Sequence, residues 1–131
     1  MANILDGDFL KEYFLIGIGG FTGAVLRYVI SGIIPVKFGI PTGTLMVNLI
    51  GSFIVGFLMY SSLFTGISYE YRLFIITGFC GALTTFSTFS YESFSLLEQH
   101  YFIKSGINIL TNVTGCISMI YFGRMVSSSF W

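Results

Sequence analysis

The third long apolar stretch of the chain contains an unusual run of hydroxyl and aromatic side chains, GALTTFSTFS, residues 81–90. Hydroxyl groups can replace water around a small ion, and a phenylalanine ring has a positively polarised edge that attracts anions. Phe86 and Phe89 are three residues apart and share one face of a helix. Such a pair usually packs against lipid or another helix. Here the neighbouring hydroxyls favour a shared role, because stripping a small anion of water costs on the order of tens of kcal/mol.

The same stretch predicts a break in its helix. Gly78 and Gly81 lie about one turn apart and precede hydroxyl and β-branched residues, which makes a weak helix between about Gly81 and Thr85. At membrane depth, broken helices occur only where they are buried in protein or line a cavity, and their released carbonyls commonly hold a cation. A bound metal ion is therefore a physical possibility at this point.

Two further apolar stretches carry polar stripes. Thr44, Asn48 and Ser52 are four residues apart and share a helix face, where small polar residues serve as interhelical contacts. The amide of Asn48 could also donate to a passing anion. A second stripe, which predicts either a water-accessible track or a packing face, consists of Lys104, Asn108, Thr111, Asn112 and Gly115.

Arg27 and Glu92 are the ionisable residues that fall well within the apolar stretches. Either side chain could extend to the membrane surface. Alternatively, Arg27 is a structural anchor or a charge that concentrates anions at a vestibule. We expect Glu92 to pair with a hydroxyl or a cation.

These residues must be positioned by membrane helices. Of the 131 residues, 54% are hydrophobic and 9% are charged, far below the charge content of a soluble domain. A helix crosses a bilayer in roughly 20 residues. The sequence predicts an all-α integral membrane protein, one domain over 1–131, with four spans at about 13–34, 43–64, 71–97 and 103–126.

Several classes of function are disfavoured. The formal net charge is zero and basic tracts are lacking, which argues against a nucleic-acid partner. Cys80 and Cys116 do not form a CxxC motif. His100 is the sole histidine and has no nucleophile or metal-ligand cluster around it in the sequence, so we expect no enzyme.

The basic residues do not set one orientation in the membrane. Four spans put both termini on one side, and the six Lys and Arg residues divide equally between the two sides. Either another feature sets the orientation, or copies insert both ways. In the second case two copies could meet about a two-fold axis in the membrane plane.

Three segments together resemble the Fluc, or CrcB, family of fluoride channels. They are GGFTGAVLRY (Gly19 to Tyr28), GTLMVNLIGSFIVG (Gly43 to Gly56) and GFCGALTTFSTFSYE (Gly78 to Glu92), in the family's order. The resemblance implies an antiparallel, dual-topology homodimer of four-helix subunits. It also implies two fluoride pathways and a structural sodium ion at the dimer axis.

The resemblance assigns roles residue by residue. Phe86, Phe89 and Asn48 are similar to the family's pore residues, with Ser87 and Thr88 as hydroxyl contacts between the rings. Gly81 and Thr84 match the residues whose backbone carbonyls hold sodium. Arg27 and Glu92 match the arginine of the first motif and the acid that closes the third.

The fourth span departs from the family's pattern. Family members commonly carry a tyrosine and serines at four-residue spacing there, and the nearest frame in this chain gives Ile107, Thr111 and Gly115. Thr111 can stand in for a serine, whereas Ile107 cannot donate a hydrogen bond. Asn108 or Asn112 could substitute.

We therefore expect a passive fluoride-selective channel in a microbial plasma membrane, which exports fluoride and limits its toxicity. One alternative is a small dual-topology multidrug exporter, which needs a membrane-embedded carboxylate, typically in the first span. Another alternative is a non-conducting membrane scaffold.

Overall fold

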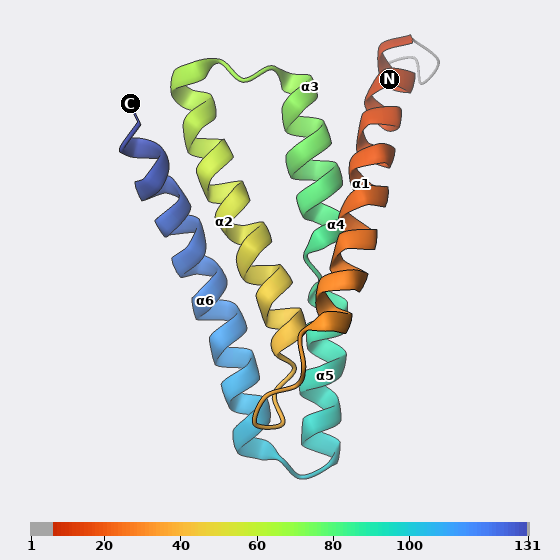
Figure 1. Cartoon of the computed structure of the whole chain (residues 1–131), viewed down its shortest axis with the longest axis vertical. Helices are drawn as coiled ribbons and strands as arrows, with labels where there is room; N and C mark the ends of the chain where they lie inside the picture. Colours follow the sequence, from red (N-terminus) through yellow and green to blue (C-terminus); the bar gives the residue numbers. More distant parts are fainter. Residues whose placement is uncertain (1–6, 131) are drawn as a thin grey trace, which may run out of the picture.

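The computed structural model describes residues 7–130, which form four long helical spans (Figure 1). The first, second and fourth spans are α1 (Gly7–Ile33), α2 (Thr42–Thr65) and α6 (Phe102–Ser128). The third consists of α3 (Tyr69–Arg72), η1 (Leu73–Cys80), α4 (Gly81–Leu83) and α5 (Phe86–Glu98). All four are long and apolar enough to cross a membrane. The expected all-α, four-span architecture is confirmed, and α1 begins ahead of the expected start near residue 13.

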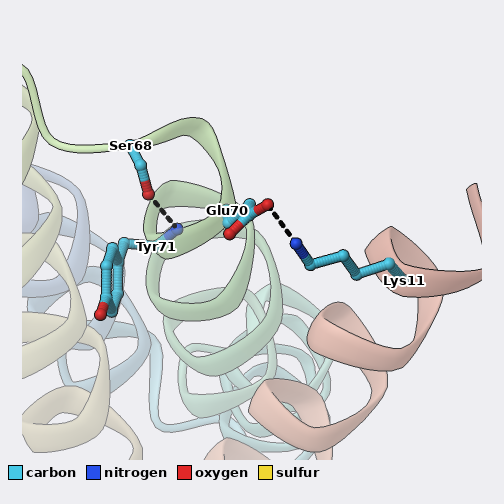
Figure 2. Close-up of polar contacts among 4 residues, drawn as sticks. All are labelled: Lys11, Ser68, Glu70 and Tyr71. Carbon is cyan, nitrogen blue, oxygen red and sulfur yellow. Dashed lines mark hydrogen bonds and ion pairs between the residues drawn. The ribbon is translucent and has the colours of Figure 1, made fainter. Parts of the chain in front are cut away.

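The spans are joined by short turns with recognisable local causes. Phe38 and Gly39, between α1 and α2, have positive φ angles of 56° and 76°. Gly66 ends α2 in the left-handed conformation, with φ 62°, which suits a residue without a Cβ atom. Ser68 then caps α3, because its hydroxyl accepts from the N–H of Tyr71 at 3.5 Å (Figure 2).

The third span is interrupted near its middle, as the sequence predicts. After α3, the chain is wound as the π-helix η1, a form that is rare and commonly found at functional sites. The helix ends at Leu83, and the next two residues are extended, with φ and ψ of −80° and 156° at Thr84 and −149° and 117° at Thr85. The helix resumes at Phe86. We call Thr84 and Thr85 the break.

The four spans pack as two close pairs. α2 packs along α6, and α1 packs against η1 and α4. Glycines allow these contacts: a Cβ atom on Gly56 would lie 2.2 Å from the carbonyl oxygen of Ile120, and one on Gly23 would lie 2.2 Å from that of Phe79. Both ends of the chain lie at the same end of the bundle, where the two pairs diverge (Figure 1).

Candidate functional site

One side chain from α2 holds the break. The N–H of Thr85 donates to Oδ1 of Asn48 at 2.8 Å, and Nδ2 of Asn48 donates to the carbonyl of Thr85 at 3.3 Å. The side-chain amide thus pairs with Thr85 as a neighbouring peptide group would. Because an unpaired peptide group is costly in apolar surroundings, this pairing lets the chain leave the helix at membrane depth.

The carbonyls of Gly81 and Thr84 are among those at the break that lose the donors a continuous helix would supply. The N–H of Thr85 would donate to Gly81, and that of Thr88 would donate to Thr84. Instead, Thr85 donates to Asn48, and the N–H of Thr88 donates to the Thr85 hydroxyl at 3.2 Å. Released carbonyls of broken membrane helices are typical sodium ligands. The carbonyls of Gly81 and Thr84 therefore fit the sodium ion that the resemblance implies.

A groove of about 320 Å³ runs beside the break, which we call the phenylalanine groove. Gly51 of α2 lets the Thr84 side chain pack closely against that helix, since a Cβ atom on Gly51 would lie 2.3 Å from Cγ2 of Thr84. Three spans contribute to the walls of the groove, with Asn48, Gly51 and Ser52 from α2, Thr84, Thr85, Phe86 and Phe89 from the third span, and Asn112 and Cys116 from α6. The groove thus combines aromatic rings, hydroxyls and amides.

The structure brings Phe86 and Phe89 together on this groove. Their ring centroids are 5.5 Å apart and the ring planes are inclined at 59°. Phe86 is 79% exposed, whereas Phe89 is 7% exposed. One ring is therefore fixed within the protomer, and the other stands at its surface, available to a ligand, to lipid or to another copy of the chain.

Buried amides connect the groove to α6 and α5. Nδ2 of Asn48 donates to Oδ1 of Asn112 at 3.0 Å, and Nδ2 of Asn112 donates to the backbone carbonyl of Asn108 at 3.0 Å and to its Oδ1 at 3.2 Å. Nδ2 of Asn108 donates to the Ser93 hydroxyl at 3.0 Å, and that hydroxyl donates to the carbonyl of Phe89 at 2.8 Å. We call Asn48, Asn112, Asn108 and Ser93 the amide chain.

Arg27 faces a second cavity, of about 390 Å³, that also reaches the break. Tyr28 and Ser31 of α1 line it, together with Thr85 and Thr88. Nε of Arg27 is buried and has no hydrogen-bond partner within residues 7–130. The guanidinium group therefore places positive charge next to the first turn of α5, where helix geometry also favours negative ligands.

Glu92 is anchored to α2 by one of its two oxygens. The Thr44 hydroxyl donates to Oε1 at 2.7 Å, so the carboxylate has the hydroxyl partner that the sequence predicts. Oε2 is buried and lacks a partner among the described residues. Half of the carboxylate therefore has no hydrogen-bond partner among the described residues.

Three other candidate residues do not line the phenylalanine groove. Ser87 is exposed, and Thr88 lines the Arg27 cavity. The Thr111 hydroxyl donates to the carbonyl of Ile107 on its own helix at 2.7 Å, and the residue does not line the groove. Asn112 lies there instead. In the sequence, Asn112 is four residues from both Asn108 and Cys116, and this spacing predicts that the three residues share one face of the helix.

Comparison with known proteins decides the family. The family model described as CrcB-like protein, Camphor Resistance (CrcB), matches residues 14–124. The chain belongs to the CrcB family. It is 99% identical over 122 residues, 93% of its length, to the whole of a protein of Methanococcus vannielii named fluoride-specific ion channel FluC.

More distant CrcB proteins carry the same name. The chain is 65% identical over 118 residues to a Methanocaldococcus jannaschii protein, with 90% of this chain and 95% of the relative covered. A Pyrococcus furiosus protein is 49% identical over 120 residues, with 90% and 97% covered. Both are named fluoride-specific ion channel FluC. Together with the four apolar helices, membership of this family makes the chain a multi-pass membrane protein.

Proposed function

We propose that the chain is a fluoride-selective channel, which lets fluoride leave the cell passively and so limits its toxicity. The observation that carries this proposal is the phenylalanine groove, where the paired rings of Phe86 and Phe89 lie beside amide and hydroxyl groups. CrcB relatives across nearly the whole chain are named as fluoride-specific channels, which supports the choice of ion. The membrane would be the plasma membrane of a microbe.

The groove supplies the chemistry that fluoride passage needs. The positively polarised edges of the two rings attract an anion, while neighbouring hydroxyl and amide groups replace its water. Phe86 and Phe89 carry this role in the proposal. Asn48 lines the groove and would donate to a passing ion in exchange for its bond to the Thr85 carbonyl, with Ser87, Thr88 and Thr111 as further hydroxyl contacts. A narrow path of this kind favours fluoride over the larger chloride, since chloride gains less from the close contacts.

A second copy of the chain would complete the path. Phe86 is 79% exposed in one protomer, so the groove has a wall that the chain itself does not supply. In the proposed antiparallel homodimer, two copies meet about a two-fold axis in the membrane plane and enclose two pathways. Labelling of single cysteines added at each terminus should find both orientations in cells. Labelling from one side alone would rule out this assembly.

A sodium ion at the dimer axis would stabilise the break. The carbonyls of Gly81 and Thr84 have lost their helical donors, and a cation would satisfy them. Exchange of sodium for N-methyl-D-glucamine at equal ionic strength should lower the unfolding temperature. An unchanged temperature would count against the ion.

Fluoride efflux from liposomes that contain only this protein tests the proposed function. We expect fluoride efflux far above that of protein-free liposomes and little chloride efflux under the same gradient. Phe86→Ile and Phe89→Ile should each slow fluoride efflux, because an aliphatic side chain has no polarised edge. Equal fluoride and chloride efflux, or normal efflux from both variants, would contradict the proposed mechanism.

A further inference from the structure

The orientation of each amide in the amide chain is fixed by backbone groups. The N–H of Thr85 can only donate, so it must face Oδ1 of Asn48, which turns Nδ2 of Asn48 toward Asn112. The backbone carbonyl of Asn108 can only accept, so it must face Nδ2 of Asn112. Both requirements leave Oδ1 of Asn112 facing Nδ2 of Asn48. The two amides therefore fit together in one orientation only.

The Asn48 amide has a partner for each of its N–H groups within the protomer. Its two hydrogens go to the Thr85 carbonyl and to Asn112, and its oxygen accepts from the Thr85 N–H. Asn112 is 4% exposed and Asn108 is 0% exposed, so both amides are largely shielded from bulk water. If Asn112 were lost, one hydrogen of the Asn48 amide would lose its partner, and only the two bonds to Thr85 would hold the amide in place.

We propose that Asn112 is a positioning residue that holds the Asn48 amide against the Thr85 peptide and so sets where α5 and its phenylalanine pair begin. Phe86 is the first residue of α5 and directly follows Thr85. The far end of the amide chain reaches the carbonyl of Phe89 through Ser93, so one network holds both ring-bearing residues. The proposal rests on the proposed function, because it assigns Asn112 to the geometry of the anion path.

The same two helices offer a matched control. The hydroxyls of Ser61 on α2 and Ser127 on α6 share a buried hydrogen bond of 2.6 Å, and neither residue touches the break. Ser127→Ala removes a polar contact between α2 and α6, as Asn112→Leu does. A purely structural role for Asn112 in joining the two helices would make the two variants behave alike.

The positioning role can be tested through amide hydrogen exchange at Thr85. This exchange is measured by NMR on the full chain in detergent micelles. Asn112→Leu should speed this exchange at least about fivefold, the effect of one hydrogen bond, and Ser127→Ala should leave it unchanged. Fluoride efflux should fall by about the same factor in Asn112→Leu only. If Asn112→Leu does not fold, Asn112→Ser is judged by the same criteria, since its shorter side chain cannot reach Asn48.

A double variant tests whether Asn112 acts through Asn48 or has an effect of its own. The change from Asn112 to Leu should cost little further efflux in an Asn48→Ala background, because the group that it positions is already gone. Unchanged exchange at Thr85, or additive losses in the double variant, would overturn the positioning role. Faster exchange at Thr85 in a protein that carries no fluoride would support it and instead contradict the proposed function.

Discussion

Two sets of polar groups lie within the apolar spans, and the protomer satisfies them to different degrees. The amide chain is fully paired, from the Thr85 peptide to the carbonyl of Phe89. By contrast, Nε of Arg27 and Oε2 of Glu92 are buried without partners in the part of the chain that the structure describes. The neutral groups stabilise the fold, whereas each of the two charged groups has one polar atom without a hydrogen-bond partner.

The difference separates polar groups that stabilise the protomer from polar groups that could bind something else. A buried polar group is normally paired, so each unpaired one calls for a ligand, an ion or another chain. Arg27 lies on α1 and Glu92 lies on α5. We expect changes in the amide chain to lower stability strongly, and changes in the two charged residues to act mainly on ion movement.

Asn48→Leu should have the largest effect. The substitution leaves both the N–H and the carbonyl of Thr85 unpaired, which costs roughly 2–4 kcal/mol in the free energy of unfolding. Fluoride efflux should fall by about two orders of magnitude. Ser62→Ala is the control on the same helix, because the Ser62 hydroxyl is exposed and bonds only to the carbonyl of Met59. Equal stability of the two variants would refute the role of Asn48 at the break.

Arg27→Gln should have a smaller effect that depends on salt. The guanidinium charge attracts anions toward the cavity beside Thr85 and Thr88, and salt screens this attraction. We expect fluoride efflux to fall roughly threefold to tenfold at an ionic strength of about 10 mM and to approach that of the unchanged protein at about 1 M.

The charge and the shape of Arg27 can be separated. Arg27→Lys keeps the charge, so its efflux at low salt should remain near that of the unchanged protein. Arg72→Gln removes an exposed charge whose Nη2 lies 3.7 Å from the sulfur of Met59, outside both cavities, and serves as the control. A loss in Arg27→Gln that persists at high salt would show that the side chain acts through contacts instead of charge.

Glu92→Gln should barely change stability, because the glutamine carbonyl can still accept from the Thr44 hydroxyl. We expect a change in the free energy of unfolding within about 0.5 kcal/mol, against about 1 kcal/mol or more for Glu92→Leu, which strands that hydroxyl. Thermal unfolding of the two variants side by side measures the difference. If both variants lose the same stability, the carboxylate is held by something other than Thr44.

The sequence predicted the elements better than it predicted the contacts. Four apolar spans and the break between Gly81 and Thr85 followed from hydropathy and from weak helix formers, which are local properties. The π-helix η1 and the pairing of Asn48 with Thr85 depend on tertiary packing between segments 37 residues apart, which periodicity does not encode.

The fourth span shows the same limit more sharply. Thr111 and Asn112 are adjacent, so a one-residue difference in frame decides which of them faces the groove. The structure gives that place to Asn112, through its contact with Asn48. The roles expected for Ser87, Thr88 and Thr111 in a fluoride path stay predictions, since these residues do not line the phenylalanine groove.

Lys11→Met should have the smallest effect, although it breaks the ion pair that joins α1 to α3 (Figure 2). Lys11 and Glu70 are 58% and 53% exposed, and exposed pairs contribute little because water and salt weaken them. Neither fluoride efflux nor the unfolding temperature should change measurably. Glu70→Gln is the matched variant and should behave in the same way. A clear loss of efflux or of unfolding temperature in both variants would show that these exposed charges matter as much as the buried ones. The distinction between paired and unpaired groups inside the membrane would then not hold.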